Sequence, residues 1–364
     1  MSRKLPAPKP PVDSPSLIRP DWTSSTRRDP NLLWLDKNEN TDPTLATTVK
    51  KIADSMPRQV GYCYPDHGPL YKKLADYLKL DPQNIIIDSG SDGLIRTVFE
   101  AFVGNGDKVI HTAPTFAMYF VYSKMYGANE ITIPYEASKN GPVLNTETLI
   151  ETIKKERPKA VFLPNPDSPT GTVFSAPDLR SIIEAAGDAD AVMLVDEAYH
   201  PFYPGTCLPW VTEYPHLLVT RSTGKAWGLA GYRIGYGAAS KELAAILHKV
   251  KAMYEVGAVP AYMLENMLDH QSEMEASVAR LLGGKADFLK AMSDLGLKVL
   301  HGEGNFIHVA FGEFSNVVHK SLADLVYYRK DFSEPCLKGY SRFSITTKEL
   351  FLPVRECIEK VIKA

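Results

Sequence analysis

One lysine, Lys225, stands between a Ser-Thr-Gly turn and a run of small residues in the stretch LLVTRSTGKAWGLAGYRIGY, residues 217–236. The turn follows an apolar, β-branched run, so the lysine comes directly after an expected strand. A lysine amine in such a place can link covalently to a carbonyl group, whereas a lysine on an exposed turn is only solvated. The stretch by itself leaves both interpretations open.

Polar residues of complementary kinds follow three other apolar runs. Ser91 and Asp92 follow NIIID and begin a helical pattern, where exposed backbone N–H groups suit a phosphate, although Ser91 could equally be an ordinary helix cap. Asp196 follows AVMLV, where a carboxylate needs a cation or a strong donor: a protonated ligand nitrogen, or else a buried cap or an arginine within the protein. The small polar turn DSPTGT follows AVFLPNP.

These four strand ends together predict a pyridoxal 5'-phosphate site. The small-residue turn at Ser91 would hold the phosphate, and Asp196 would keep a ring nitrogen protonated. Lys225 would then be linked covalently to the cofactor aldehyde, which explains a single cation among residues suited to close burial.

Strands and helices are expected to alternate from about residue 84 onward. β-Branched runs predict strands at 84–88, 108–113, 129–135, 160–166, 191–199, 217–223 and 233–239. Apolar spacing of three and four predicts helices at 91–103, 115–126, 145–156 and 175–187. This alternation predicts an α/β fold, with a mostly parallel sheet and helices on both faces. Ligands of such a sheet bind at the carboxyl ends of its strands, where the four polar sites lie.

The length of 364 residues favours two domains. We expect an irregular, Pro-rich arm over residues 1–40, partly disordered and packing with the smaller domain. A large cofactor-binding domain is expected over 41–265, and a smaller α+β domain over 266–364.

Composition and charge limit which classes of binding partner and which cellular compartment are expected. A formal net charge of −2 at pH 7 makes nucleic acid and anionic membranes poor partners and favours a small metabolite. The four cysteines lie far apart without zinc-type spacing, so neither a disulfide framework nor a metal site is expected. The first residues lack the apolar run of a signal peptide, and no stretch of the chain is apolar for long enough to span a membrane. We therefore expect a soluble cytoplasmic protein.

A series of ordered motifs resembles one enzyme family. The motifs are LDKNEN, YPD, GSDGLI, PTFAMY, NPDSPTG, DEAY, STGKAWGLAGYRIGY and YSRFSITT. Their order resembles the fold type I, class I/II aminotransferases, and is most like the histidinol-phosphate aminotransferase branch. The likeness covers roughly residues 32–362. It implies a pyridoxal-phosphate-dependent aminotransferase.

The resemblance implies roles around the cofactor ring. Lys225 would be the lysine linked to the cofactor, and Asp196 the partner of the pyridine nitrogen. Tyr199 resembles the tyrosine that donates to the phenolic oxygen. Phe116 stands where the family stacks an aromatic ring on the cofactor, although an aromatic residue beside a sheet can also lie in the core.

The resemblance also implies how the phosphate is held. Ser91, Asp92, Ser222 and Arg233 would bind it, the first two partly through backbone N–H groups. Tyr64 resembles the tyrosine that reaches the phosphate of the neighbouring subunit, which implies a homodimer with shared active sites.

Substrate roles are carried over to three residues. Arg342 resembles the arginine that binds the acidic group of the substrate, and Asn38 is expected to line the substrate side. Arg329 lies where the branch carries a second arginine, although a solvated Arg329 is an open alternative. Two anion-binding arginines favour an amino acid with an additional carboxylate or phosphate.

Two positions and one segment depart from the family pattern; the segment is LDKNENTDP, which lacks the usual proline and aromatic residue after NEN. Ser168 replaces the asparagine that donates to the phenolic oxygen, so control of the proton on the lysine–cofactor link should weaken. Gly224 replaces the usual serine before the lysine, so one phosphate hydrogen bond is expected to be missing. These changes agree with the cofactor but weaken the case for a role in histidine biosynthesis.

The predicted function is transamination between an amino acid, with glutamate as donor, and a 2-oxo acid or phosphorylated amino compound. The alternative keeps the cofactor but makes the protein a decarboxylase or lyase, as in the threonine-phosphate decarboxylase relatives. A regulatory module fused to a DNA-binding domain is disfavoured, because the arm before the fold is too short for such a domain.

Overall fold

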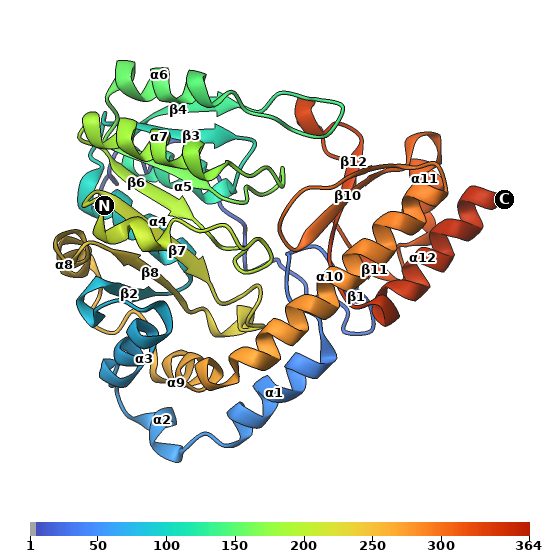
Figure 1. The fold of residues 1–364 in the computed structure, drawn as a ribbon, viewed down its shortest axis with the longest axis horizontal. Coiled ribbons are helices and arrows are strands. Elements are labelled where there is room, and N and C mark those ends of the chain that lie inside the picture. The colour runs from blue at the N-terminus through green and yellow to red at the C-terminus, as the bar shows by residue number, and fades with distance from the viewer. Residues whose placement is uncertain (1–4) are drawn as a thin grey trace, which may run out of the picture.

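The computed structural model describes residues 5–364 and places two sheets side by side, each covered by helices (Figure 1). Residues 1–4, with which the predicted arm begins, lie outside the described part. One of these sheets has seven strands and the other has three, and a third sheet consists of only two short strands. No helix among residues 5–364 is both long and apolar enough to cross a bilayer.

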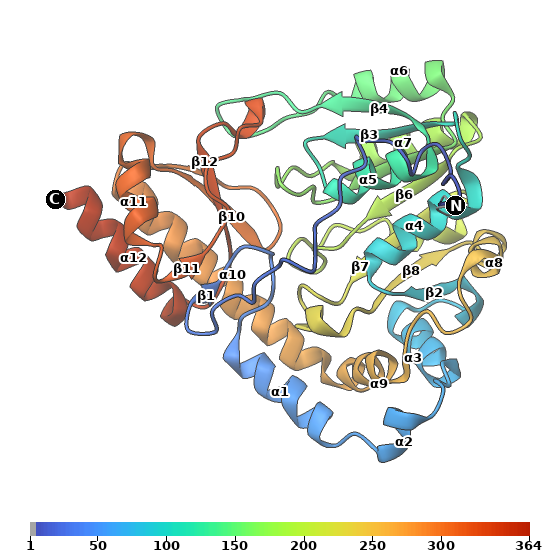
Figure 2. The ribbon, with the colours of Figure 1, turned by 180° about the vertical axis from the view of Figure 1, so that it is seen from behind.

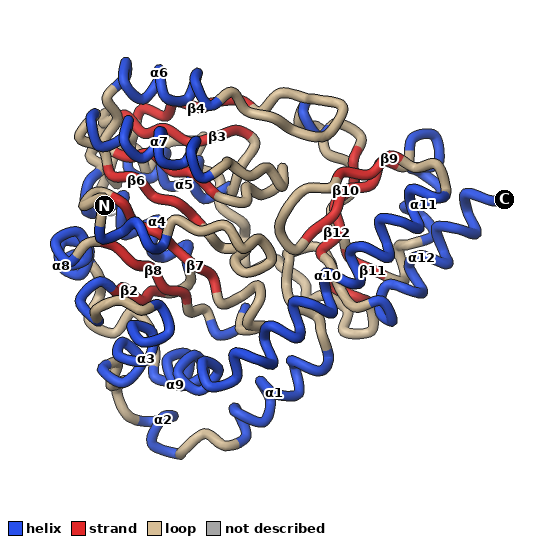
Figure 3. Tube along the Cα trace, viewed as in Figure 1, coloured by secondary structure: helices blue, strands red, loops and turns tan. Residues whose placement is uncertain are grey.

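The seven-stranded sheet confirms the predicted, mostly parallel arrangement (Figure 3). Its order is β2 (Ile85–Asp88), β8 (Gly235–Ala239), β7 (Leu217–Ser222), β6 (Val192–Asp196), β5 (Ala160–Pro164), β3 (Lys108–Ala113) and β4 (Asn129–Pro134). Strand β8 runs antiparallel to both of its neighbours, and the strands from β7 to β4 are parallel. The carboxyl ends of β5, β6 and β7 therefore meet at one edge.

Both faces of this sheet are buried. Along β5, Val161 and Leu163 belong to one apolar cluster, whereas Phe162 between them belongs to another. Successive side chains of a strand point to opposite faces, so the two clusters lie on opposite sides of the sheet. A strand buried on both faces has a nearly continuous apolar sequence, which is why AVFLP and AVMLV stand out.

Helices cover the two faces. They are α3 (Gly68–Leu78), α4 (Ser91–Phe102), α5 (Ala117–Tyr126), α6 (Thr146–Glu156), α7 (Ala176–Asp188), α8 (Lys241–Val250) and α9 (Ala258–Met267). The four helices expected from apolar spacing are confirmed. Asn145 and Ser175 cap α6 and α7, where their side chains accept hydrogen bonds from backbone N–H groups.

The three-stranded sheet is antiparallel, in the order β12 (Tyr340–Ser344), β10 (Phe306–Ala310) and β9 (Lys298–Leu300). It is covered by α10 (Gln271–Asp294), α11 (Ser315–Ser321) and α12 (Lys348–Lys363). Phe288 of α10 stacks on Phe351 of α12, with ring centroids 4.4 Å apart. Helix α10 runs from the large sheet to this smaller one (Figure 1).

The amino-terminal arm contacts both parts of the molecule (Figure 2). Arg19 donates to the Met118 sulfur of α5, while β1 (Leu33–Trp34) pairs with β11 (Val326–Tyr327) beside the smaller sheet. The chain then continues into α1 (Pro43–Asp54) and α2 (Arg58–Tyr62). The division into an arm and two domains at residues 40 and 265 stays a prediction.

Candidate active site

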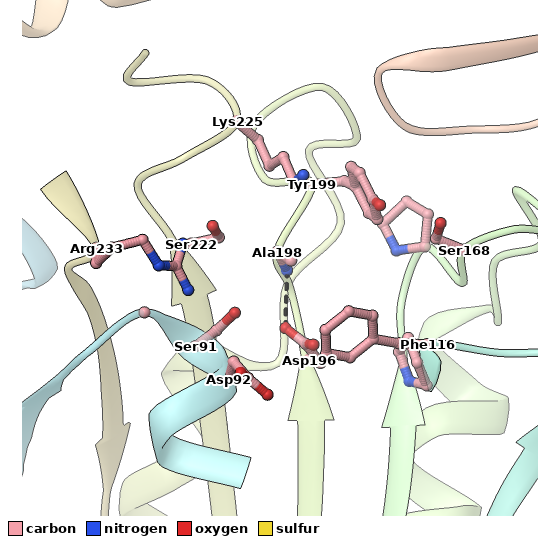
Figure 4. Close-up of a pocket in the computed structure, with 13 residues that line it drawn as sticks. Ser91, Asp92, Phe116, Ser168, Asp196, Ala198, Tyr199, Ser222, Lys225 and Arg233 are labelled. Atoms are coloured by element: carbon pink, nitrogen blue, oxygen red, sulfur yellow. Dashed lines mark hydrogen bonds between the residues drawn. The ribbon is translucent and has the colours of Figure 1, made fainter. Parts of the chain in front are cut away.

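A cavity of about 280 Å³ lies at the carboxyl ends of β5, β6 and β7 and beside the start of α4 (Figure 4). It brings together most of the site residues that the sequence predicts. Its lining includes Ser91, Asp92, Phe116, Ser168, Asp196, Tyr199, Ser222, Lys225 and Arg233. Residues separated by more than a hundred positions thus face one space.

The start of α4 leaves backbone donors free. Gly90 is the residue before the helix, with φ of 89°, and no side chain caps the helix. Ser91 is the first helical residue, so the alternative that it is the ordinary cap is wrong. Strand β8 approaches so closely that a Cβ on Gly235 would collide with the Ser91 amide. The free N–H groups and the positive end of the helix suit an anion.

Arg233 adds a cation at the same end of the cavity. Its guanidinium lies against Gly90, where an added Cβ would be 3.0 Å from Nη2. Within residues 5–364, no carboxylate lies within 4 Å of this guanidinium. Ser222 also lines the cavity, and its Oγ accepts a hydrogen bond from the Gly224 amide at 3.2 Å. A side chain at Gly224 would crowd Ala230, since a Cβ would lie 3.1 Å from its Cα.

Asp196 is a buried carboxylate at the end of β6. It accepts hydrogen bonds from the Thr220 hydroxyl at 3.0 Å, the Ala198 amide at 3.1 Å and the Tyr119 hydroxyl at 3.3 Å. Burial raises its pKa from 3.8 to about 6. The internal Asp–Arg pair that the sequence left open does not form among residues 5–364, where the nearby Arg221 pairs with Glu197. Asp196 therefore suits a cationic ligand group.

Lys225 lies across the cavity from Asp196 (Figure 4). Its amine donates to the Lys37 carbonyl at 2.8 Å and lies 6.0 Å from the centre of the Tyr199 ring. Burial and then the charge of Arg342 lower its pKa from 10.5 to about 8. A larger fraction of the amine is therefore uncharged and nucleophilic at neutral pH than for an exposed lysine.

The Tyr199 hydroxyl faces the cavity and is held from behind by Asn38. The Asn38 amide donates to this hydroxyl at 2.9 Å, and Asn38 is buried with a left-handed backbone, φ 56°. Phe116, directly before α5, is 39% exposed and lines the cavity beside Asp196. The alternative that Phe116 lies in the core is therefore wrong.

Arg342 lies next to Ser168. Its guanidinium donates to Ser168 Oγ and to the Asp36 carbonyl, both at 3.2 Å, while its buried Nε has no partner among the described residues. No carboxylate of residues 5–364 comes within 4 Å of this guanidinium. Burial lowers its pKa, because it destabilises the charged form. A guanidinium in this position needs an anion from outside the chain.

Arg329 is placed beside Arg342 but differs from it. The two residues exchange backbone hydrogen bonds of 3.0 and 2.8 Å. The Arg329 side chain is 49% exposed and pairs with Glu334 at 3.2 Å. The Arg329 guanidinium is therefore not simply solvated, because it pairs with Glu334. It is also not free to bind an anion, whereas the Arg342 guanidinium pairs with no carboxylate of residues 5–364.

Tyr64 does not line this cavity. It is 80% exposed, and its ring stacks on Tyr254 with centroids 4.7 Å apart. Its predicted reach to the phosphate of a partner subunit stays a prediction.

Several residues that support the site were not expected from the sequence. Tyr119 and Thr220 hold Asp196, but a hydroxyl within a helix or strand gives no signal of its own. Asp167 is the least expected: it is fully buried and accepts hydrogen bonds from Thr112 at 2.7 Å and Thr115 at 3.1 Å. It ties the end of β3 and the turn before Phe116 to the loop that carries Ser168.

Asp167→Asn should change how stability depends on pH. Burial raises the pKa of Asp167 from 3.8 to about 7, so the folded state binds more protons than the unfolded state between these values. Its contribution to stability is therefore full below pH 4 and is lost as the pH rises through 7. We expect the variant to gain about 1–3 kcal/mol in free energy of unfolding at pH 8 and little at pH 4. Denaturant unfolding of the apoprotein at both pH values measures this, with exposed Asp324→Asn as control. An equal effect at the two pH values would refute the assignment.

Ser168→Asn should test the main departure from the family. A longer donor to the phenolic oxygen stabilises its anionic form, so the pKa of the holoenzyme's visible absorbance should fall. A pH titration of that absorbance measures the shift, and Ser168→Ala should move the pKa in the opposite direction. An unchanged pKa in both variants would mean that residue 168 does not reach this oxygen.

The groups around the cavity fit pyridoxal phosphate. Among residues 5–364, no carboxylate pairs with Arg233 and no cation pairs with the buried Asp196, and the Lys225 amine between them has a lowered pKa. The backbone N–H groups at the start of α4 are not capped by a side chain. These are the partners that a phosphate, a protonated ring nitrogen and an aldehyde require.

Comparisons with known proteins agree with this chemistry. Residues 30–354 match the family model described as aminotransferase class I and II. The histidinol-phosphate aminotransferases of Caldanaerobacter subterraneus and Thermoanaerobacter pseudethanolicus are 32% and 33% identical over 319 residues, covering 86% of this chain and 89% of each relative.

Solved structures share the fold. The histidinol-phosphate aminotransferase from Sinorhizobium meliloti, in complex with pyridoxal-5'-phosphate, gives a TM-score of 0.78 at 22% identity and 91% coverage of both chains. An aspartate aminotransferase mutant from Thermus thermophilus gives 0.75 at 20% identity, covering 91% of this chain and 92% of its own. The chain belongs to the class I and II aminotransferases, in the branch of the histidinol-phosphate aminotransferases, and is an enzyme with pyridoxal phosphate as its cofactor.

Proposed function

We propose that this aminotransferase takes its amino group from glutamate. The acceptor would be a 2-oxo acid, or the oxo compound that corresponds to a phosphorylated amine such as histidinol phosphate. The observation that carries the proposal is Arg342, whose guanidinium pairs with no carboxylate of residues 5–364 and donates to Ser168, a residue of the cavity wall. It would bind the α-carboxylate of an amino acid, because a carboxylate is the anion that a guanidinium fork recognises.

The site residues would divide the chemistry as follows. Pyridoxal phosphate supplies the electron sink that an amino acid needs to lose its α-proton. Lys225 Nζ would take that proton from the substrate Cα and deliver it to the former aldehyde carbon of the cofactor, on the far side of the amino nitrogen, a role suited to an amine of pKa about 8. Asp196 would hold the proton on the ring nitrogen, and Phe116 would cover one face of the ring.

The remaining residues would position the groups. Tyr199 and Ser168 would donate to the phenolic oxygen. Ser91, Ser222 and Arg233, with the free N–H groups at Ser91 and Asp92, would hold the phosphate.

We also propose a homodimer that shares its active sites. Tyr62, Tyr64 and Met253 are 74%, 80% and 82% exposed in the single chain. Exposed patches of large apolar side chains mark protein–protein interaction sites. A partner subunit would cover these side chains, and Tyr64 would then lie near the phosphate site of that partner. Size measurement in solution, repeated with Tyr64→Ser, addresses this proposal.

Half-reactions test the proposed function. Holoenzyme mixed with glutamate alone should convert its bound cofactor to the pyridoxamine form and release one equivalent of 2-oxoglutarate. Histidinol phosphate should do the same if the second substrate is of that type. Carbon dioxide released without the pyridoxamine form would instead support a decarboxylase.

A further inference from the structure

A second cavity, of about 620 Å³, adjoins the first, and Phe116 and Ser168 line both. We call it the side pocket. Its walls are mostly apolar and come from Phe120, Pro134, Tyr135, Pro169, Phe332 and Cys336. A cavity of this volume is large enough for a bulky substrate group.

Arg342 fixes where the side pocket lies relative to a substrate. It lines the side pocket, and its Nη1 donates to Ser168 at the boundary between the two cavities. An amino acid whose α-carboxylate binds Arg342 would therefore have the side pocket within reach of its side chain. The walls of this pocket would then select which side chains bind.

The side pocket carries two further charges, and they neutralise each other. Arg329 and Glu334 both line it and form an ion pair of 3.2 Å. The Arg329 guanidinium also lies 4.4 Å over the ring of Phe332, a second favourable contact for its charge. An anionic side chain would have to draw Arg329 away from Glu334 and would meet the repulsion of that carboxylate.

We propose that the side pocket binds a large neutral side chain, aromatic or aliphatic, and that Glu334 determines this specificity by holding Arg329. The inference rests on the proposed function for the location of the α-carboxylate. A neutral side chain leaves the ion pair intact and gains contact with the apolar walls. Glutamate, the proposed amino donor, binds in the same place more weakly, because its side-chain carboxylate must compete with Glu334 for Arg329. The large neutral side chain therefore belongs to the proposed 2-oxo acid acceptor.

Two non-reacting probes separate side-chain binding from catalysis. Glutarate and 3-phenylpropionate each present one carboxylate to Arg342, but they place a second carboxylate or a phenyl ring in the side pocket. Calorimetric titration of the holoenzyme should give tighter binding of 3-phenylpropionate. In Glu334→Gln, glutarate should bind up to about fivefold more tightly, the scale for a partly exposed charge, while 3-phenylpropionate changes little.

Matched variants make the result specific. Glu313→Gln removes the same charge from an exposed residue outside the side pocket and should change neither affinity. Adding Arg329→Gln to Glu334→Gln should abolish the gain for glutarate. Tighter binding of glutarate than of 3-phenylpropionate by the parent enzyme, or an unchanged ratio in Glu334→Gln, would overturn the inference. A parent enzyme that binds both probes as expected but forms no pyridoxamine from any amino acid would instead contradict the proposed function.

Discussion

Lys225→Ala should reduce turnover by at least about four orders of magnitude, because proton transfer by a positioned side chain alone contributes up to about 10⁴-fold. The substitution also removes the amine that is proposed to link to the cofactor. The variant should still fold and bind pyridoxal phosphate, since Ser222, Arg233 and the start of α4 are unchanged. Steady-state kinetics, with cofactor binding measured by fluorescence, would show both effects.

Lys290→Ala is the matched control for this prediction. Lys290 is an exposed lysine of α10 that pairs with Asp294, and its loss should leave turnover unchanged. Added methylamine should restore part of the lost rate in Lys225→Ala, because a small amine can move the proton at Cα. Turnover within tenfold of the parent enzyme would remove Lys225 from the proposed role.

Asp196→Asn should lower turnover by about 10²- to 10⁴-fold, because an amide cannot hold the ring nitrogen in its protonated state. Thr220, Tyr119 and the Ala198 amide now donate to the carboxylate, and the Asn oxygen can still accept from at least one of them. The fold should therefore persist. Kinetics and cofactor affinity, measured together on the same preparation, would test this expectation.

The stability of Asp196→Asn shows whether Asp196 acts in the site or only supports the fold. Burial raises its pKa to about 6, so the carboxylate's contribution to apoprotein stability declines as the pH rises from about 4 through 6. At pH 8 the Asn variant without cofactor should be at least as stable as the parent. A variant that is inactive because it unfolds at pH 8, or one that keeps nearly full activity, would contradict the assignment.

Much of the large sheet was predictable because its strands are buried on both faces. Runs such as AVFLP and KVIHTA are short, largely apolar and contain β-branched residues, a pattern that favours buried strands, and they became β5 and β3. The reversed direction of β8 was not predictable from its sequence, because strand direction depends on where the chain returns to the sheet. Helix α4 was expected, but its uncapped start appeared only in the backbone at Gly90.

The candidate site was predictable at residues whose charge is unfavourable in its sequence context unless a partner compensates it. A carboxylate after an apolar strand and a lysine among small residues both need a partner, so Asp196 and Lys225 could be found from sequence. Partners that lie far apart in the chain, such as Tyr119 and Thr220 for Asp196, could not be found from the sequence. Glu334 is close to Arg329 in sequence, yet their ion pair depends on the turn between them and was not expected.

Borohydride treatment of the holoenzyme tests the central claim most directly, because it makes the link between lysine and cofactor permanent. Proteolysis and mass spectrometry of the reduced protein then identify the modified residue. We predict one pyridoxyl group for each chain, on the peptide that contains Lys225, and none in Lys225→Ala treated in the same way. Stoichiometric labelling of another lysine, with Lys225 unmodified, would contradict the assignment of this site.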